Sequence, residues 1–190
     1  MGSLTTHLNP FSDDAVFSRS RLNAYALWDN GFPDSFETGT VKGLRQIHHV
    51  LFGGLYDFAG EIRTLNIAKG GFQFAMAEYL EKSLSAIENM PEGNFDQIID
   101  KYIEMNVAHP FMEGNGRSGR LWLDAMLRKR LGLTADWSRI GKMEYLQAMT
   151  ESVSDGTRIK RLLYDALTDR VSERGLFARS IDCSWHYEEP

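Results

Sequence analysis

Twelve consecutive residues, 109 to 120, combine a histidine, an acid, a glycine-rich turn and two arginines. His109 is the candidate general base, because an imidazole exchanges protons near neutral pH. The carboxylate of Glu113 precedes Gly-Asn-Gly, a turn that lets a ligand approach the backbone closely. Arg117 and Arg120 stand three positions apart, so a shared helix face is expected for them. The combination is typical of a nucleotide triphosphate site built around a histidine.

Two helices must position these groups. Apolar side chains at helical spacing run from Phe95 to Val107, and Pro110 predicts that this helix ends at about His109. A second helix is expected from Arg117 to Gly132. Its first turn attracts anions, because the N–H groups there are unpaired and the helix dipole is positive. Arg117 and Arg120 fall in this first turn, where the dipole disfavours a cation, so a polyphosphate or an acidic side chain is expected opposite them.

The string resembles the complete signature of the Fic family, His-Pro-Phe-x-(Asp/Glu)-Gly-Asn-Gly-Arg-x-x-Arg. A helix–loop–helix corner with an ordinary turn is the alternative for Gly-Asn-Gly alone, since short glycine motifs recur widely. The resemblance extends through Gly43–His48, Leu55–Arg63 and Asn66–Ala75, and covers residues 38–190. It implies an all-α fold, a Fic helical bundle with one small β-hairpin flap. Residues 1–37 would be an N-terminal segment packed on this domain or leading into it.

The family implies transfer of AMP from ATP to a Tyr, Thr or Ser hydroxyl of a target protein. His109 would be the catalytic base, and Glu113 would hold Mg²⁺, a hard ion that prefers oxygen ligands. Arg120 would hold the γ-phosphate, and the Gly-Asn-Gly turn would be the anion hole for the inner phosphates. The nucleotide-binding residues that the resemblance implies are Lys69, Asn106, Gly114, Asn115, Gly116, Arg117, Ser118, Gly119 and Arg120.

Gly116 favours AMP transfer over phosphate transfer, because the death-on-curing toxins, which phosphorylate, carry a bulkier basic residue there. Two alternatives stay open. One is an ATP-dependent phosphotransferase of the same fold, whose target would gain phosphate alone. The other is a non-catalytic regulatory module that binds ATP, for which His109→Ala would leave the partner's behaviour unchanged.

The segment from Leu65 to Ala75 predicts a β-hairpin, because alternating apolar residues flank a glycine turn. It is the only β element expected. The segment resembles the family's flap, which aligns an extended target segment by strand addition. The expected target-docking residues are Ile67, Gly70, Gly71 and Phe72. Type II topoisomerase subunits are the targets that the resemblance suggests.

The segment from Ser184 to Glu188 resembles the family's inhibitory motif, Ser/Thr-x-x-x-Glu-Gly/Asn, within a C-terminal helix expected at about 176–190. Glu188 would pair with Arg120 and remove the cation that orients the γ-phosphate. Glu189 departs from the motif, because it stands where the family has Gly or Asn. The position of the motif resembles the third class of Fic proteins, for which self-assembly into homo-oligomers is a further expectation. The alternative is a capped terminal helix with surface charges.

Composition narrows the remaining classes of function. The net charge of −5, without a dense basic block, disfavours direct nucleic-acid binding. Cys183 is the only cysteine, which fits a reducing cytoplasm. No apolar run approaches the roughly 18 residues that span a membrane. His48 and His49 point about 100° apart on a helix, so they are unsuited to chelate one zinc ion.

Overall fold

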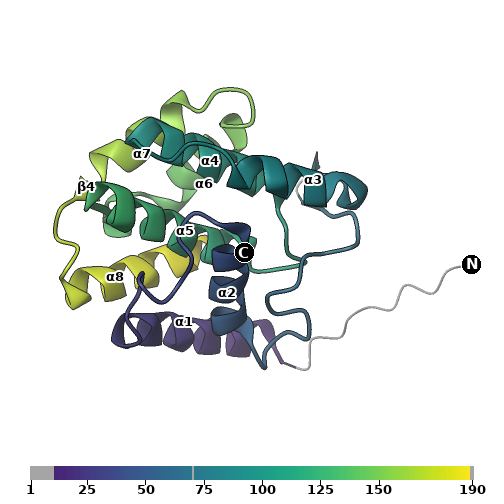
Figure 1. Cartoon of the computed structure of the whole chain (residues 1–190). Helices are drawn as coiled ribbons and strands as arrows, with labels where there is room; N and C mark the ends of the chain where they lie inside the picture. The colour runs from purple at the N-terminus through teal and green to yellow at the C-terminus, as the bar shows by residue number, and fades with distance from the viewer. Residues whose placement is uncertain (1–10, 70, 189–190) are drawn as a thin grey trace, which may run out of the picture.

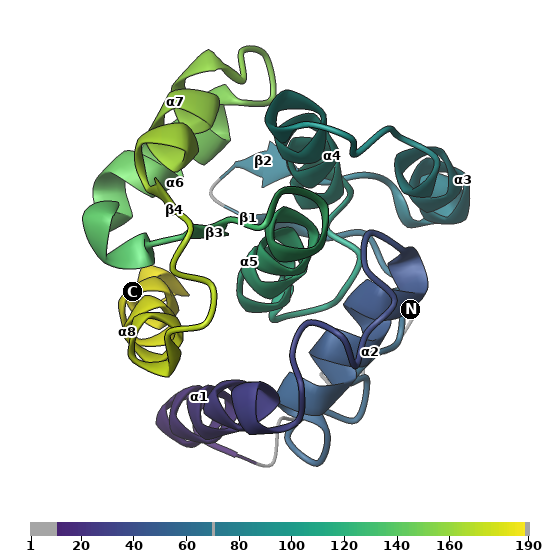
Figure 2. The same cartoon turned by 60° about the vertical axis from the view of Figure 1, so that its left-hand side comes forward.

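The computed structural model describes residues 11–69 and 71–188 of the chain. This part forms a bundle in which α5 lies at the centre (Figures 1 and 2). Every residue of α5 from Arg117 to Met126 is buried. The helices are α1 Asp13–Asp29, α2 Val41–Phe52, α3 Ala77–Glu88, α4 Phe95–Ala108, α5 Asn115–Met126, α6 Lys142–Glu151, α7 Thr157–Asp165 and α8 Arg174–Trp185. The expected all-α bundle is confirmed.

Buried apolar side chains recur at helical spacing in these helices. Leu44, Ile47 and Leu51 are buried along one face of α2, and this face packs on α5. The α4 helix ends at Ala108, one residue before the expected end, and His109 caps it. The helix that begins with α5 continues as a π-helical turn and ends at Gly132, which has a left-handed backbone. The two helices that carry the motif therefore form as the sequence predicts.

The predicted hairpin is present, with β1 Ala68–Lys69 antiparallel to β2 Phe72–Gln73. The expectation of a single β element is wrong. A second two-stranded sheet pairs β3 Thr134–Ala135 with β4 Leu167–Thr168. A strand of two residues is too short to show alternation of apolar and polar residues. Because β3 and β4 are also far apart in the sequence, no hairpin pattern indicated this sheet. Leu167 follows Leu162 and Leu163 at helical spacing in the sequence, but α7 ends at Asp165 and Leu167 lies in β4.

The α1 helix occupies part of the segment 1–37 and packs on α2 and α8 (Figure 2). The Oγ of Ser12 caps its start by accepting the Ala15 N–H at 3.3 Å. Ser20, buried in its middle, receives hydrogen bonds from Arg117 Nη1 and Trp185 Nε1, both at 3.1 Å. One hydroxyl of α1 thus joins α5 to α8. Within the described residues, no helix is both long enough and apolar enough to cross a membrane.

Candidate active site

His109 lies at the end of α4 in a left-handed conformation, with φ 50° and ψ 63°. It is the only residue other than glycine with positive φ in the described chain. Its ring stacks on Phe74 with centroids 3.7 Å apart, and Nδ1 lies 3.1 Å from the Asn106 carbonyl. An Nδ1–H that donates to this carbonyl leaves Nε2 unprotonated. Burial lowers the pKa of His109 to about 4, so the ring is neutral at pH 7 and can accept a proton.

A cavity of about 520 Å³ opens beside His109. The hairpin, the loop that follows His109, the start of α5, α6 and the C-terminal turn enclose it. Ten of the residues that the sequence suggested line it, namely Ile67, Lys69, Phe72, Asn106, His109, Glu113, Asn115, Gly116, Arg120 and Glu188. The structure therefore brings the histidine, the acid, the turn and one arginine around one cavity.

Two glycines lie at the start of α5, and the second of them, Gly116, lines the cavity. Gly114 starts α5 with φ 80°, and a Cβ there would lie 2.5 Å from Phe52. A Cβ at Gly116 would lie 2.2 Å from Glu188 Oε1. The side chain of Asn115 holds the loop, since it accepts the Phe111 N–H and donates to the Phe111 carbonyl, both at 2.8 Å. The first turn of α5 is thus open to a carboxylate or a phosphate.

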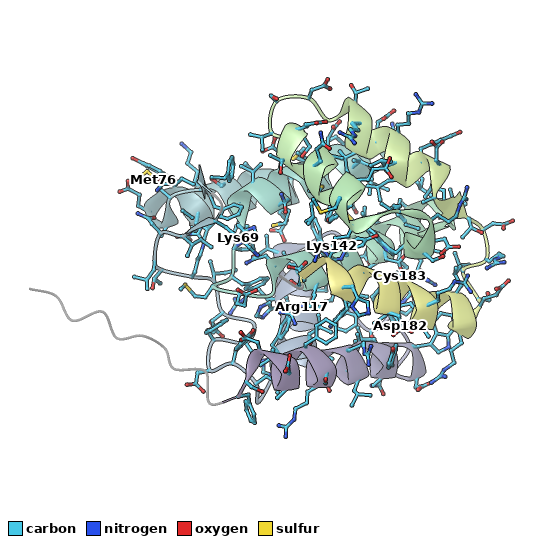
Figure 3. All side chains as sticks on the ribbon, turned by 180° about the vertical axis from the view of Figure 1, so that it is seen from behind. Lys69, Met76, Arg117, Lys142, Asp182 and Cys183 are labelled. Atoms are coloured by element: carbon cyan, nitrogen blue, oxygen red, sulfur yellow. The ribbon has the colours of Figure 1, made fainter. Side chains whose placement is uncertain are left out.

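The structure does not place four of the expected nucleotide-binding residues, Gly114, Arg117, Ser118 and Gly119, on the cavity. Positions 116 and 120 are one helical turn apart and share the cavity face, whereas 117, 118 and 119 turn into the core. Arg117 lies between α1 and α8 (Figure 3), against Ser20 and over the Phe52 ring at 4.7 Å. The expected shared face of Arg117 and Arg120 is therefore not seen.

Arg120 is held by the C-terminal segment. Its Nη1 lies 2.9 Å from Glu188 Oε1, and its Nη2 donates to the Ser184 carbonyl at 2.8 Å. Ser184 thus acts through its backbone, while its hydroxyl faces the Ile181 carbonyl at 3.5 Å. The side chain of Arg120 is 3% exposed and that of Glu188 is 21% exposed. Burial would raise the pKa of Glu188, but the charge and hydrogen bond of Arg120 hold it below its usual range.

Glu188 lies on a short 3₁₀ turn, His186–Glu188, that follows α8. Tyr187 anchors this turn, because its hydroxyl donates to the Ile140 carbonyl at 2.6 Å. The rings of Trp137, Tyr145 and Tyr187 surround the Arg120 guanidinium at 5.3–6.0 Å. Glu189 lies outside the described residues, as does Gly70 of the hairpin.

Glu113 projects toward solvent at the cavity wall, with a side chain that is 54% exposed. Its Oε1 accepts the Gly114 N–H at 3.0 Å. Among residues 11–69 and 71–188, no three His, Cys, Asp or Glu side chains gather as a metal site. A single carboxylate suits Mg²⁺, an ion that commonly takes its other ligands from phosphates and water.

Sequence reasoning missed the α6 wall of the cavity and the role of His48. Leu146 and Met149 of α6, with Val153 just after it, add apolar side chains to the cavity lining. His48 is fully buried, and its Nε2–H donates to the Glu113 carbonyl at 2.9 Å while its Nδ1 accepts the Gly60 N–H. Burial lowers its pKa to about 4, so this neutral form persists at pH 7. Spacing ruled out chelation by His48 and His49, but it carried no signal for this contact with the loop.

This helical bundle thus sets a histidine, the open start of a helix and an arginine around one cavity. Residues 39–127 match the model of the Fic/DOC family. This segment of the chain is a Fic/DOC family segment.

Three known proteins illustrate the similarity. The protein adenylyltransferase VbhT of Bartonella schoenbuchensis is 30% identical over 80% of this chain, which spans only 38% of that protein. The probable protein adenylyltransferase Fic of Escherichia coli K12 is 25% identical, over 70% of this chain and 73% of that protein. The crystal structure of BepC from Bartonella tribocorum with bound AMPPNP has a TM-score of 0.69 at 20% identity, and the match covers 83% of this chain and 88% of that one. This last likeness shows that the fold is shared.

Proposed function

We propose that this chain is a protein adenylyltransferase, which transfers AMP from ATP to a Tyr, Thr or Ser hydroxyl of a target protein. The observation that carries the proposal is the single cavity between His109 Nε2 and the start of α5 with Arg120. The names of the relatives and the AMPPNP bound to BepC support it. In this cavity a triphosphate on Gly116 and Arg120 would lie within reach of a neutral histidine.

In the proposed reaction, His109 Nε2 takes the proton of the target hydroxyl. The hydroxyl oxygen forms a bond to the α-phosphorus of ATP, the bond from that phosphorus to the bridging oxygen breaks, and pyrophosphate leaves. The first turn of α5 at Asn115 and Gly116 stabilises the charge that develops on the phosphate oxygens. Arg120 pairs with the γ-phosphate and so fixes which phosphorus faces His109.

Glu113 would hold Mg²⁺, which neutralises phosphate charge when it is bound. The apolar wall of Leu146, Met149 and Val153 offers a surface for the adenine ring. Lys69, labelled in Figure 3, lies on the exposed β1 strand, is part of the cavity lining and adds positive charge there. The hairpin residues Ile67 and Phe72 would align the target segment.

We also propose that Glu188 inhibits this activity, as in the third class of the family. The Glu188 carboxylate occupies the space beside Gly116 and pairs with Arg120, where the γ-phosphate would bind. ATP and Glu188 would then compete for one guanidinium. Type II topoisomerase subunits as targets, a cytoplasmic location and assembly into homo-oligomers remain proposals that rest on the resemblance.

Incorporation of label from ATP tests the function and its inhibition together. The chain, Glu188→Gly and Glu188→Gly with His109→Ala are incubated in a cytosolic lysate with ATP labelled at the α-phosphate or at the γ-phosphate. We expect Glu188→Gly to raise α-label incorporation more than tenfold, roughly what the loss of one strong charged hydrogen bond predicts, and His109→Ala to abolish it. Incorporation of γ-label alone would instead show phosphate transfer. Absence of any incorporation by Glu188→Gly would contradict the proposal.

A further inference from the structure

Arg63 lies in the loop between α2 and β1 and is buried, with 4% of its surface exposed. Its guanidinium binds backbone carbonyls on two separate pieces of the chain. On one side, Nε donates to the His109 carbonyl at 2.7 Å and Nη2 donates to the Ala108 carbonyl at 3.0 Å. On the other side, Nη1 donates to the Leu65 carbonyl at 2.7 Å and Nη2 to the Ala75 carbonyl at 2.5 Å.

The first pair of contacts stabilises the conformation of the catalytic residue. Carbonyls at the end of a helix have no partner within the helix, and a left-handed backbone outside glycine costs about 1–3 kcal/mol. Arg63 satisfies the Ala108 and His109 carbonyls, and its own N–H donates to the Pro110 carbonyl at 2.9 Å. Three consecutive carbonyls at the sharp turn are therefore held by one residue.

The second pair of contacts holds both ends of the hairpin. Leu65 precedes β1 and Ala75 follows β2, so the guanidinium closes the hairpin at its base. Ala75 is also tied to α4, because its N–H donates to the Val107 carbonyl at 3.2 Å. Phe74, its neighbour, stacks on the His109 ring. The hairpin and the histidine are thus connected through the guanidinium and through a ring contact.

We propose that Arg63 is a positioning residue for the transfer reaction, because it fixes the hairpin that docks the target relative to the His109 imidazole. The inference rests on the proposed function. A target strand aligned on the hairpin would present its hydroxyl at a distance from Nε2 that depends on these four carbonyl contacts. A planar guanidinium with five donors can bridge them, whereas the ammonium of lysine is a point charge.

If Arg63 positions the hairpin, its loss should affect the transfer rate and nucleotide binding differently, whereas a general loss of stability would impair both. Arg63 is not among the residues that line the cavity, and none of its hydrogen bonds reaches Gly116 or Arg120. Its loss should therefore lower the maximal rate of transfer and leave nucleotide binding intact. A misplacement of about 1 Å costs about 100-fold in rate.

Hydrogen exchange of the purified chain tests the coupling without any assay of activity. The variants are Arg63→Met, Arg63→Lys and, as a control, Arg161→Met on α7, whose side chain is 85% exposed. In Arg63→Met, amides of residues 65–75 should exchange about tenfold faster or more, as the loss of a charged hydrogen bond predicts, while α5 keeps its protection. Unchanged exchange in 65–75 would overturn the inference. A uniform increase that includes α5 would show a structural role only and would also overturn it.

Kinetics in the Glu188→Gly background provide the second measurement. Arg63→Met should lower the maximal rate of AMP incorporation about 100-fold, with the apparent KM for ATP close to that of the parent. Arg63→Lys should recover part of this loss. Full recovery would show that the planar arrangement of the guanidinium donors is not needed, and would refute that part of the inference. A raised KM for ATP at an unchanged maximal rate would also refute the inference. If the Glu188→Gly parent itself transfers no AMP, the proposed function fails, and the exchange data still decide whether Arg63 couples the hairpin to His109.

Discussion

Replacing Gly116 by alanine should put a methyl group where the Glu188 carboxylate now lies. The added Cβ would be 2.2 Å from Glu188 Oε1 and 3.0 Å from its Cδ, well inside contact distance. The next atom, Arg120 Nη1, is 3.1 Å away, at the end of a flexible side chain that can yield slightly. The collision is therefore specific to Glu188 and should vanish in Glu188→Gly.

The size of the effect follows from two opposing contributions. Loss of a hydrogen bond to a charged group costs about 1.5–3 kcal/mol. The displaced carboxylate, already 21% exposed, can reach water, and the buried Arg120 keeps its hydrogen bond to the Ser184 carbonyl and its aromatic neighbours, so the larger cost of an unpaired buried charge is reduced. Alanine in place of glycine within a helix returns about 0.5–1 kcal/mol. The net destabilisation is about 1–2 kcal/mol, which for a chain of this length lowers Tm by about 2–8 °C.

A double-mutant cycle measured by thermal unfolding gives the result directly. It compares the parent, Gly116→Ala, Glu188→Gly and the double variant at one pH and protein concentration. In the Glu188→Gly background, alanine at 116 should raise Tm by about 1–4 °C, since only the helix contribution remains. An equal loss of stability in both backgrounds would refute the reasoning, because it would place the clash somewhere other than at Glu188.

Acid should remove the contribution of Glu188 to stability. Its pKa is lowered on folding, so the difference in unfolding free energy between the parent and Glu188→Gln should be present at neutral pH and vanish as the pH falls below about 4.5, measured by urea unfolding. The protonated form of His109 is a cation and its folded pKa is about 4, so as the pH falls from 6.5 the unfolded chain takes up this proton before the folded chain does. His109→Gln should accordingly lose less stability than the parent between pH 6.5 and 4; equal losses would contradict the burial of a neutral ring. Gly114→Ala should cost more than about 1 kcal/mol beyond Gly54→Ala. Both positions have positive φ, but only a Cβ at 114 would meet Phe52; equal costs in guanidinium unfolding would exclude that clash.

The sequence predicted those parts of the site that local spacing determines. The position of Pro110 and the apolar pattern before it placed His109 at a helix end, and α4 ends there. Alternating apolar residues on both sides of a glycine turn predicted the hairpin. The contact of Glu188 with Arg120 came from the resemblance, and the structure contains it at 2.9 Å.

Contacts between distant segments could not be obtained in this way. Spacing of three suggested that Arg117 and Arg120 act together, but α1 supplies a hydroxyl that draws Arg117 into the core. Which arginine lines the cavity depends on how α5 is oriented in the bundle. The spacing of residues along α5 does not determine this orientation. The contacts of Arg63 could not be predicted for a similar reason. Its partners are backbone carbonyls, which any residue provides, so the sequence carries no signal for them.

The hydrogen bonds of the Ser20 hydroxyl show that α1 supports parts of the chain that a shortened version would lose. The family match begins at residue 39, whereas α1, which backs α8 through Trp185, ends at Asp29. A chain shortened to the matched segment would keep residues 109–120 and lose α8, the 3₁₀ turn after it that carries Glu188, and the α1 surface on which α8 packs. Ser184 and Glu188, which accept hydrogen bonds from Arg120, thus lie outside the segment by which the family is identified, so the proposed transfer reaction and its proposed inhibition can be altered separately.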